Sequence, residues 1–138
     1  KQFGNNHSAR CIIYSYDFDL INPTYRTGEE ITQQLNEGIS ALQATSAGII
    51  LLCSNTMHQY AGIVSEKFVD GFFLDIRDCV GEYLQKNNIA NCLLLGTRFT
   101  MCEPFYADYI SSKYAVSIAV PEIEEQTVIH SIIFEELI

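Results

Sequence analysis

The sequence predicts an α/β fold in which a mainly parallel sheet is flanked by helices. Short apolar runs alternate with longer segments whose apolar residues recur every three or four positions, the patterns of buried strands and amphipathic helices. The apolar runs are unbroken, which is typical of parallel strands covered on both faces. Strands and helices that alternate in this way favour a parallel sheet with right-handed crossovers.

In the first half of the chain, the clearest elements are a helix over residues 29–45 and a strand over residues 48–53. The strand is an uninterrupted run of β-branched and large aliphatic residues that turns polar at Ser54. The helix is predicted by four apolar residues that form one stripe: Ile31, Leu35, Ile39 and Leu42. We further expect a strand at 10–16, a helix at 57–68 and a strand at 72–76.

In the second half, a helix over residues 77–88 is predicted by apolar residues on one side and by the two asparagines that end it. Pro104 suits the first turn of a later helix. Pro121 ends the apolar run of residues 114–120. The remaining expected elements are a strand at 91–96, a helix from Pro104, a strand at 114–120 and a helix at 124–138.

Charge and hydropathy exclude several classes of function. The net charge is -9, whereas a protein that mainly binds nucleic acid or an anionic membrane needs a basic face. No apolar run approaches the roughly 18 residues of a spanning helix, and no charged-then-apolar leader opens the sequence. We therefore expect a cytoplasmic protein whose partners include neither nucleic acid nor a membrane.

The five cysteines predict neither a disulfide frame nor a metal site. They are widely spaced, form no C-x-x-C pair and have no histidine at ligand spacing. We expect reduced thiols, mostly buried, because Cys11, Cys79 and Cys92 fall in predicted strands or helices. No lysine falls in a predicted strand-end loop, where a pyridoxal phosphate Schiff base would need it, so no cofactor is expected.

Small polar residues follow two of the predicted strands in the same way, as L-L-C-S-N-T and as L-L-L-G-T-R-F-T. Ligands of parallel sheets bind at the carboxyl ends of the strands, so two such loops are expected to face each other across a cleft. Asn55 and Thr56 are small donors that can hold a carboxylate there. The alternative is that they only cap the following helix.

Five short motifs follow one another along the chain: H-S-A-R at 7–10, Y-D-F at 16–18, L-C-S-N-T-M-H at 52–58, L-L-G-T-R-F-T-M at 94–101 with F-Y at 105–106, and I-I-F-E-E-L at 132–137. In this order they resemble the aspartate/glutamate racemase family, and the resemblance covers essentially the whole chain. The resemblance implies a cofactor-independent isomerase that inverts the α-carbon of an acidic amino acid, aspartate or glutamate. It also implies parts of two similar α/β domains, here residues 1–76 and 77–138, with the site between them.

The family it resembles uses two bases on opposite faces of the substrate, usually cysteines, one before an Asn-Thr pair and one in a G-C-T-E loop. Such thiols can be tuned toward neutrality and exchange protons without a metal. Alignment on Asn55 and Thr56 places Ser54 at the first position, where a neutral hydroxyl can relay or donate a proton but cannot be a free base. Because neighbouring strand residues face opposite ways, Cys53 would reach the site only through a bulge; this alternative stays open.

The sequence contains no G-C-T-E loop, so we interpret the chain as a fragment of that architecture. The resemblance also implies that Thr97 and Thr100 contribute hydroxyls from the second loop, with helix capping as the alternative. Arg98 is either a carboxylate partner or a surface ion-pair residue. Arg26 lies where some relatives place a substrate-binding arginine, and His58 is expected to support the site or start a helix.

The resulting interpretation is a racemase of an acidic amino acid in which Ser54 is the catalytic residue. Two alternatives stay open. One is a related isomerase or decarboxylase that forms a carbanion, and the other is a non-catalytic module of the racemase fold that binds an acidic small molecule. The edges and apolar faces of an incomplete sheet also predict a homo-oligomer, such as a dimer.

Overall fold

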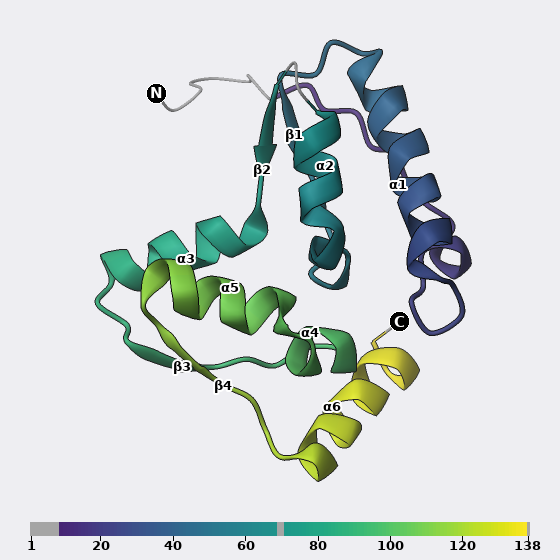
Figure 1. The fold of residues 1–138 in the computed structure, drawn as a ribbon. Helices are drawn as coiled ribbons and strands as arrows, with labels where there is room; N and C mark the ends of the chain where they lie inside the picture. Colours follow the sequence, from purple (N-terminus) through teal and green to yellow (C-terminus); the bar gives the residue numbers. More distant parts are fainter. Residues whose placement is uncertain (1–8, 69–70, 138) are drawn as a thin grey trace.

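The computed structural model describes residues 9–68 and 71–137, and within them the predicted class is confirmed: parallel strands are flanked by helices (Figure 1). None of the helices in this part of the chain is long and apolar enough to cross a membrane. The elements are η1 (Phe18–Leu20), α1 (Gly28–Gln43), β1 (Ile49–Leu51), η2 (Thr56–Tyr60), α2 (Ala61–Lys67), β2 (Phe72–Leu74), α3 (Ile76–Lys86), β3 (Asn91–Leu93), α4 (Arg98–Cys102), α5 (Pro104–Tyr114), β4 (Ser117–Ala119) and α6 (Ile123–Glu135).

The strands in the described residues pair into two small parallel sheets. Ile50 of β1 lies opposite Phe73 of β2, and Cys92 of β3 lies opposite Ile118 of β4. Each pair is a β-α-β unit, with η2 and α2 crossing over in the first and α4 and α5 in the second. Helix α3 follows β2 and packs on α5 (Figure 1), so it joins the two units. The predicted division after residue 76 falls at the start of α3 and stays a prediction.

Helix α1 forms where the stripe predicted it and covers one face of the β1–β2 sheet. It begins at a capping box, in which the Thr27 hydroxyl accepts from the Glu30 N–H at 3.3 Å and the Glu30 carboxylate accepts from the Thr27 N–H at 2.8 Å. Two backbone donors at the helix start are thereby satisfied. Ile31, Leu35 and Ile39 are at most 3% exposed, so the predicted core stripe is confirmed.

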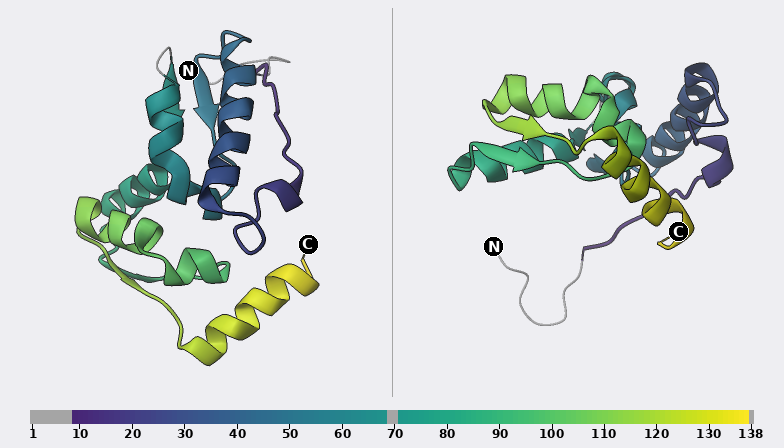
Figure 2. Two further views of the ribbon diagram at one scale, coloured as in Figure 1. Left: turned by 45° about the vertical axis from the view of Figure 1, so that its right-hand side comes forward. Right: turned by 90° about the horizontal axis from the view of Figure 1, so that it is seen from below.

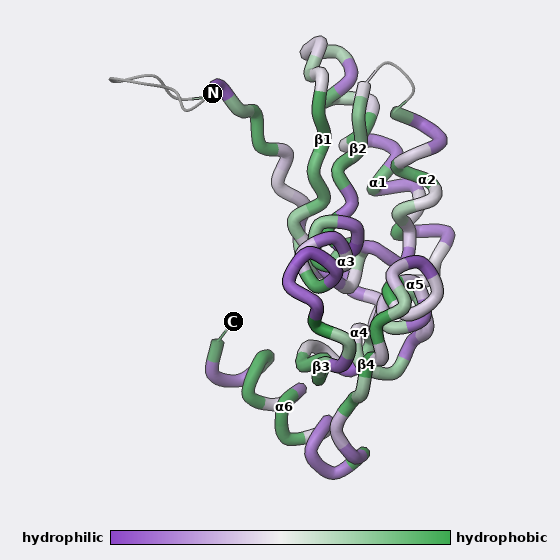
Figure 3. Tube along the Cα trace, turned by 90° about the vertical axis from the view of Figure 1, so that its left-hand side faces the viewer, coloured by the Kyte–Doolittle hydropathy of each residue, from purple (hydrophilic) through white to green (hydrophobic). Residues whose placement is uncertain are grey.

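The other face of each sheet is open in the described residues. Ile49, Leu51, Phe72 and Leu93 each expose about 60% of their surface, and β1 and β2 are hydrophobic along their length (Figure 3). The helices therefore cover each sheet from one side only. The prediction of buried thiols is wrong: Cys92 on β3 is only half-buried, and the other four cysteines, which lie outside the strands, are exposed: Cys11, Cys53, Cys79 and Cys102.

The prediction of a strand at residues 10–16 is also wrong, since residues 9–17 form neither helix nor strand. A strand exists through its hydrogen bonds to a neighbour, and β1 and β2 pair with each other in the described residues. The segment instead runs beside α1 (Figure 1). There the Tyr16 side chain fills the space above Gly38. Tyr14 packs edge-on against Tyr16, with the centroids of the two rings 5.0 Å apart.

Three helical segments differ from the prediction. The helix expected at 57–68 is divided into η2 and α2, and the polar loop after β3 contains α4, which is too short to show a helical period. The final helix, α6, ends at Glu135; Ile138, which the prediction included, lies outside the described residues. Figure 2 shows α6 set apart from both sheets, beside α4.

Helices α3 and α5 approach closely at Gly81. A Cβ at this position would overlap the ring of Tyr114, which is 8% exposed. Gly81→Ala is therefore expected to lower the free energy of unfolding, measured with urea, by about 1–3 kcal/mol through overpacking. Gly62→Ala on α2 is the control: a Cβ there meets no atom within 4 Å, and the helix should gain about 0.5–1 kcal/mol. Equal effects of the two substitutions would contradict the close contact.

Candidate active site

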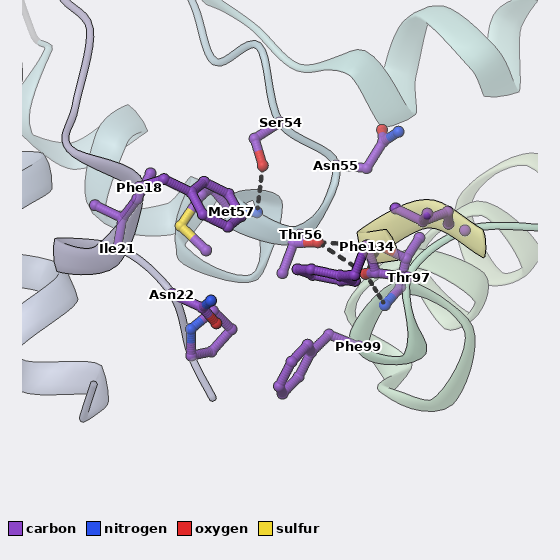
Figure 4. Close-up of a pocket in the computed structure, with 14 residues that line it drawn as sticks. Phe18, Ile21, Asn22, Ser54, Asn55, Thr56, Met57, Thr97, Phe99 and Phe134 are labelled. Carbon is purple, nitrogen blue, oxygen red and sulfur yellow. Dashed lines mark hydrogen bonds between the residues drawn. The ribbon is translucent and has the colours of Figure 1, made fainter. Parts of the chain in front are cut away.

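The polar loops after β1 and β3 line one cavity of about 290 Å³ (Figure 4). Five residues that the sequence singled out lie in its wall: Ser54, Asn55, Thr56, Thr97 and Thr100. The expectation that the two loops face each other is thereby confirmed. Each loop follows the first strand of its own two-stranded sheet, so the cavity joins the carboxyl ends of two strands that do not pair with each other.

Three threonine hydroxyls join the loops into one cluster. The Oγ1 atom of Thr56 lies 3.0 Å from that of Thr97 and 3.5 Å from that of Thr100, and the last two are 3.1 Å apart. Thr97 also caps α4, since its hydroxyl accepts from the Thr100 N–H at 3.4 Å. The Thr97 side chain therefore both caps α4 and lines the cavity. Each hydroxyl has one donor hydrogen that can turn toward an anion.

Ser54, and not Cys53, lies at the cavity. Ser54 is half-buried and its Oγ accepts from the Met57 N–H at 3.4 Å, whereas Cys53 is exposed and lies outside the described cavity wall. This is the alternation expected of neighbouring residues at a strand end. Asn55 is exposed and makes no side-chain capping bond to η2, so the helix-cap alternative is not observed for its amide.

An apolar wall opposite the hydroxyls was not predicted from the sequence. It is formed by Phe18 before α1, Phe99 on α4 and Phe134 on α6, and the rings of Phe18 and Phe134 are 6.4 Å apart. Figure 4 shows these rings below and beside Thr56. All three belong to motifs that carry the family resemblance, namely Y-D-F, L-L-G-T-R-F-T-M and I-I-F-E-E-L, and these motifs could have identified them.

The two candidate arginines lie outside the described cavity wall. The Nη2 of Arg26 lies 2.6 Å from the Asp19 carboxylate, and its Nε donates to the Asp19 carbonyl at 3.0 Å. Arg98 is exposed, and its backbone N–H donates to Nδ1 of His130 at 3.3 Å. In the part of the chain that the structure describes, no group of three His, Cys, Asp or Glu side chains is arranged to hold a metal ion.

His58 lies directly behind the Ser54 loop and is 1% exposed. Its Nε2 faces the N–H of Ile76 at 3.2 Å, and its Nδ1 faces the carbonyl of Ser54 at 2.7 Å. A backbone N–H can only donate and a carbonyl can only accept, so the ring must carry its proton on Nδ1. Burial lowers the pKa of His58, which keeps the ring in this neutral form.

Comparison with known proteins extends the likeness beyond these motifs. No protein-family model matches the chain. A Yersinia pestis protein proposed to be an Asp/Glu racemase is 31% identical, with a TM-score of 0.87 over 99% of this chain and 60% of its own. An aspartate racemase homologue from Pyrococcus horikoshii OT3 is also 31% identical, with a TM-score of 0.83 over 99% of this chain and 59% of its own. The chain thus spans about three fifths of the length of either protein.

Proposed function

We propose, because this chain is a homologue of the aspartate/glutamate racemases, that it is an isomerase acting at the α-carbon of an acidic amino acid without a cofactor. One observation supports this proposal above all: hydroxyls from both strand-end loops meet at a single cavity. Ser54 comes from the loop after β1, and Thr97 and Thr100 come from the loop after β3. Neither loop alone would surround a substrate.

In this proposal the threonine cluster binds the α-carboxylate. Removal of the α-proton spreads negative charge onto the carboxylate oxygens, so donors aimed at them bind the transition state more tightly than the ground state. The hydroxyls of Thr56, Thr97 and Thr100 are suited to this task because they are already held within 3.5 Å of one another. Little reorganisation is then needed as the charge develops.

Ser54 is proposed to deliver a proton to one face of the α-carbon. The Cα–H bond breaks toward a base on the opposite face, a new C–H bond forms from the Ser54 hydroxyl, and Ser54 takes a proton from water in the same step. The hydroxide left by that water is neutralised by the proton that the base then releases to solvent, which restores both groups. This relay avoids a free serine alkoxide. The family resemblance implies a cysteine of a G-C-T-E loop as the opposite base, a motif that this sequence does not contain.

Proton exchange in D2O tests the proposal. The 138-residue chain, and any longer product of its gene that contains it, are incubated with each enantiomer of aspartate and glutamate, and loss of the Cα–H signal is followed by NMR. We expect exchange, and we expect Ser54→Ala to slow conversion between enantiomers by about 10²–10⁴-fold. Ser65→Ala, an exposed serine on α2, is the matched control and should behave as the wild type.

The outcomes separate the proposed isomerase from a second candidate, a binding module for an acidic small molecule. This candidate is favoured by the presence of Ser54 where the resembled family has a thiol. Binding of aspartate or glutamate without exchange, in folded protein, would contradict the isomerase and support the module. Conversion between enantiomers at the wild-type rate in Ser54→Ala would retain the isomerase but exclude Ser54 from proton transfer, whereas exchange without conversion would leave Ser54 as the second proton donor.

A further inference from the structure

We infer that His58 is a positioning residue for Ser54: its ring holds the Ser54 carbonyl from behind the loop and so directs the Ser54 hydroxyl into the cavity. The kinetic consequence of this inference rests on the proposed function. The geometry does not, because it concerns only where the Ser54 peptide is held.

The contacts on the cavity side explain why Ser54 needs such support. Its hydroxyl has one long bond, from the Met57 N–H at 3.4 Å, so its direction depends mainly on the backbone. The ring Nδ1 of His58 lies 2.7 Å from the Ser54 carbonyl oxygen, the shortest contact of this loop. The backbone N–H of His58 donates to the Asn55 carbonyl at 3.0 Å. One residue thus restrains both peptides that flank Asn55.

The contacts on the other side of the ring connect it to a rigid part of the molecule. Nε2 of His58 accepts from the N–H of Ile76, the first residue of α3, whose start is capped by the Asp75 carboxylate. Arg77 donates to that carboxylate through Nε and Nη2. Its Nη1 donates to the carbonyl of Phe105, a residue of α5, at 2.8 Å. The position of the Ser54 loop is therefore set by the α3–α5 pair.

A ring that merely filled the core would need neither nitrogen, so two amide substitutions, each of which retains one of the two hydrogen bonds, separate the roles. The amide nitrogen of His58→Asn lies near the place of Nδ1 and can still donate to the Ser54 carbonyl. The amide oxygen of His58→Gln lies near the place of Nε2 and can still accept from Ile76, but the bond to Ser54 is lost. Asparagine is smaller than glutamine and leaves more empty space at this buried position, so lost packing alone would harm His58→Asn more than His58→Gln, the reverse of the order expected for the positioning role.

Steady-state racemisation kinetics of the two variants, after thermal unfolding has shown both to be folded, provide the test. We expect His58→Gln to lower kcat by about 10–100-fold with KM within about threefold of the wild type, because a small misplacement of a reacting group is costly. His58→Asn should retain kcat within about threefold. Equal loss in both variants, or wild-type kcat in His58→Gln, would overturn the inference.

NMR of the imidazole and of the Asn55 amide keeps this result separate from a failure of the proposed function. The wild-type ring should show a protonated Nδ1 and an unprotonated Nε2 at neutral pH, whether or not the protein has activity. The Asn55 amide signal should stay in place in His58→Asn and shift in His58→Gln, since it reports the bond to the Ser54 carbonyl. The opposite tautomer, or an unshifted signal in His58→Gln, would exclude the positioning role even in an inactive protein.

Discussion

Thr56→Val is expected to reduce kcat/KM for racemisation by about 10²-fold or more, the usual effect of removing one donor from a preorganised anion site. Valine has nearly the shape of threonine, so the cavity keeps its form while the Thr56 hydroxyl is lost. That hydroxyl bonds to both Thr97 and Thr100, and it is the link between the two loops. Initial rates at several substrate concentrations, followed by circular dichroism, measure the effect.

Thr45→Val is the matched control for this substitution. Thr45 is exposed beyond the end of α1, and its hydroxyl donates only to the Leu42 carbonyl of the same turn at 2.7 Å. We expect kcat/KM to stay within about twofold of the wild type there, because a solvent-exposed change far from the cavity leaves the donors in place. If Thr56→Val were as active as Thr45→Val, the threonine cluster would not bind the carboxylate.

Arg77→Met is expected to lower the free energy of unfolding by about 3–5 kcal/mol, the largest stability effect proposed for this chain. Arg77 and Asp75 are each 8% exposed, and Nη2 lies 2.6 Å from the carboxylate. Without the guanidinium, a charged carboxylate would remain buried with no opposite charge in contact. Urea denaturation, with the slope checked for two-state behaviour, measures the loss.

Arg26→Met is the control, because the Arg26–Asp19 pair has the same 2.6 Å separation but lies near the surface, with 31% and 63% of the side chains exposed. Solvent screening limits such a pair to about 1 kcal/mol or less. The double substitution Asp75→Asn with Arg77→Met should regain part of the stability, since no charge then stays buried. Equal losses in the two arginine variants would show that burial does not decide the strength of these pairs.

The fold class and the general place of the site were predictable because they depend on local patterns. The α1 stripe is a property of neighbouring residues, and so is the change from apolar to polar at Ser54. The prediction that two such loops face each other also succeeded, although β1 and β3 lie in separate sheets and the loops meet through the packing of the two units. The family motifs identified Ser54 by their order along the chain.

Other features depended on which segments meet in space. Residues 10–16 have the composition of a strand but no ladder partner in the described residues, so they lie against α1. Burial of the cysteines depended on which side of each element faces the core: Cys79, for example, lies on α3 but not among its buried residues. Arg26 resembled a carboxylate ligand in the sequence, and only the folded chain shows Asp19 occupying its guanidinium.

The sequence by itself determined the α/β class, the core face of α1 and the identity of the polar residues after β1 and β3, because each follows from local periodicity. Only the tertiary structure decided that Thr56 reaches Thr97 across 41 positions and that Ser54, not Cys53, faces the cavity. It alone decided that His58 is neutral, with its proton on Nδ1, between Ser54 and Ile76. The physical reason is that directional hydrogen bonds and burial join residues far apart in the chain, whereas periodicity reports only on near neighbours.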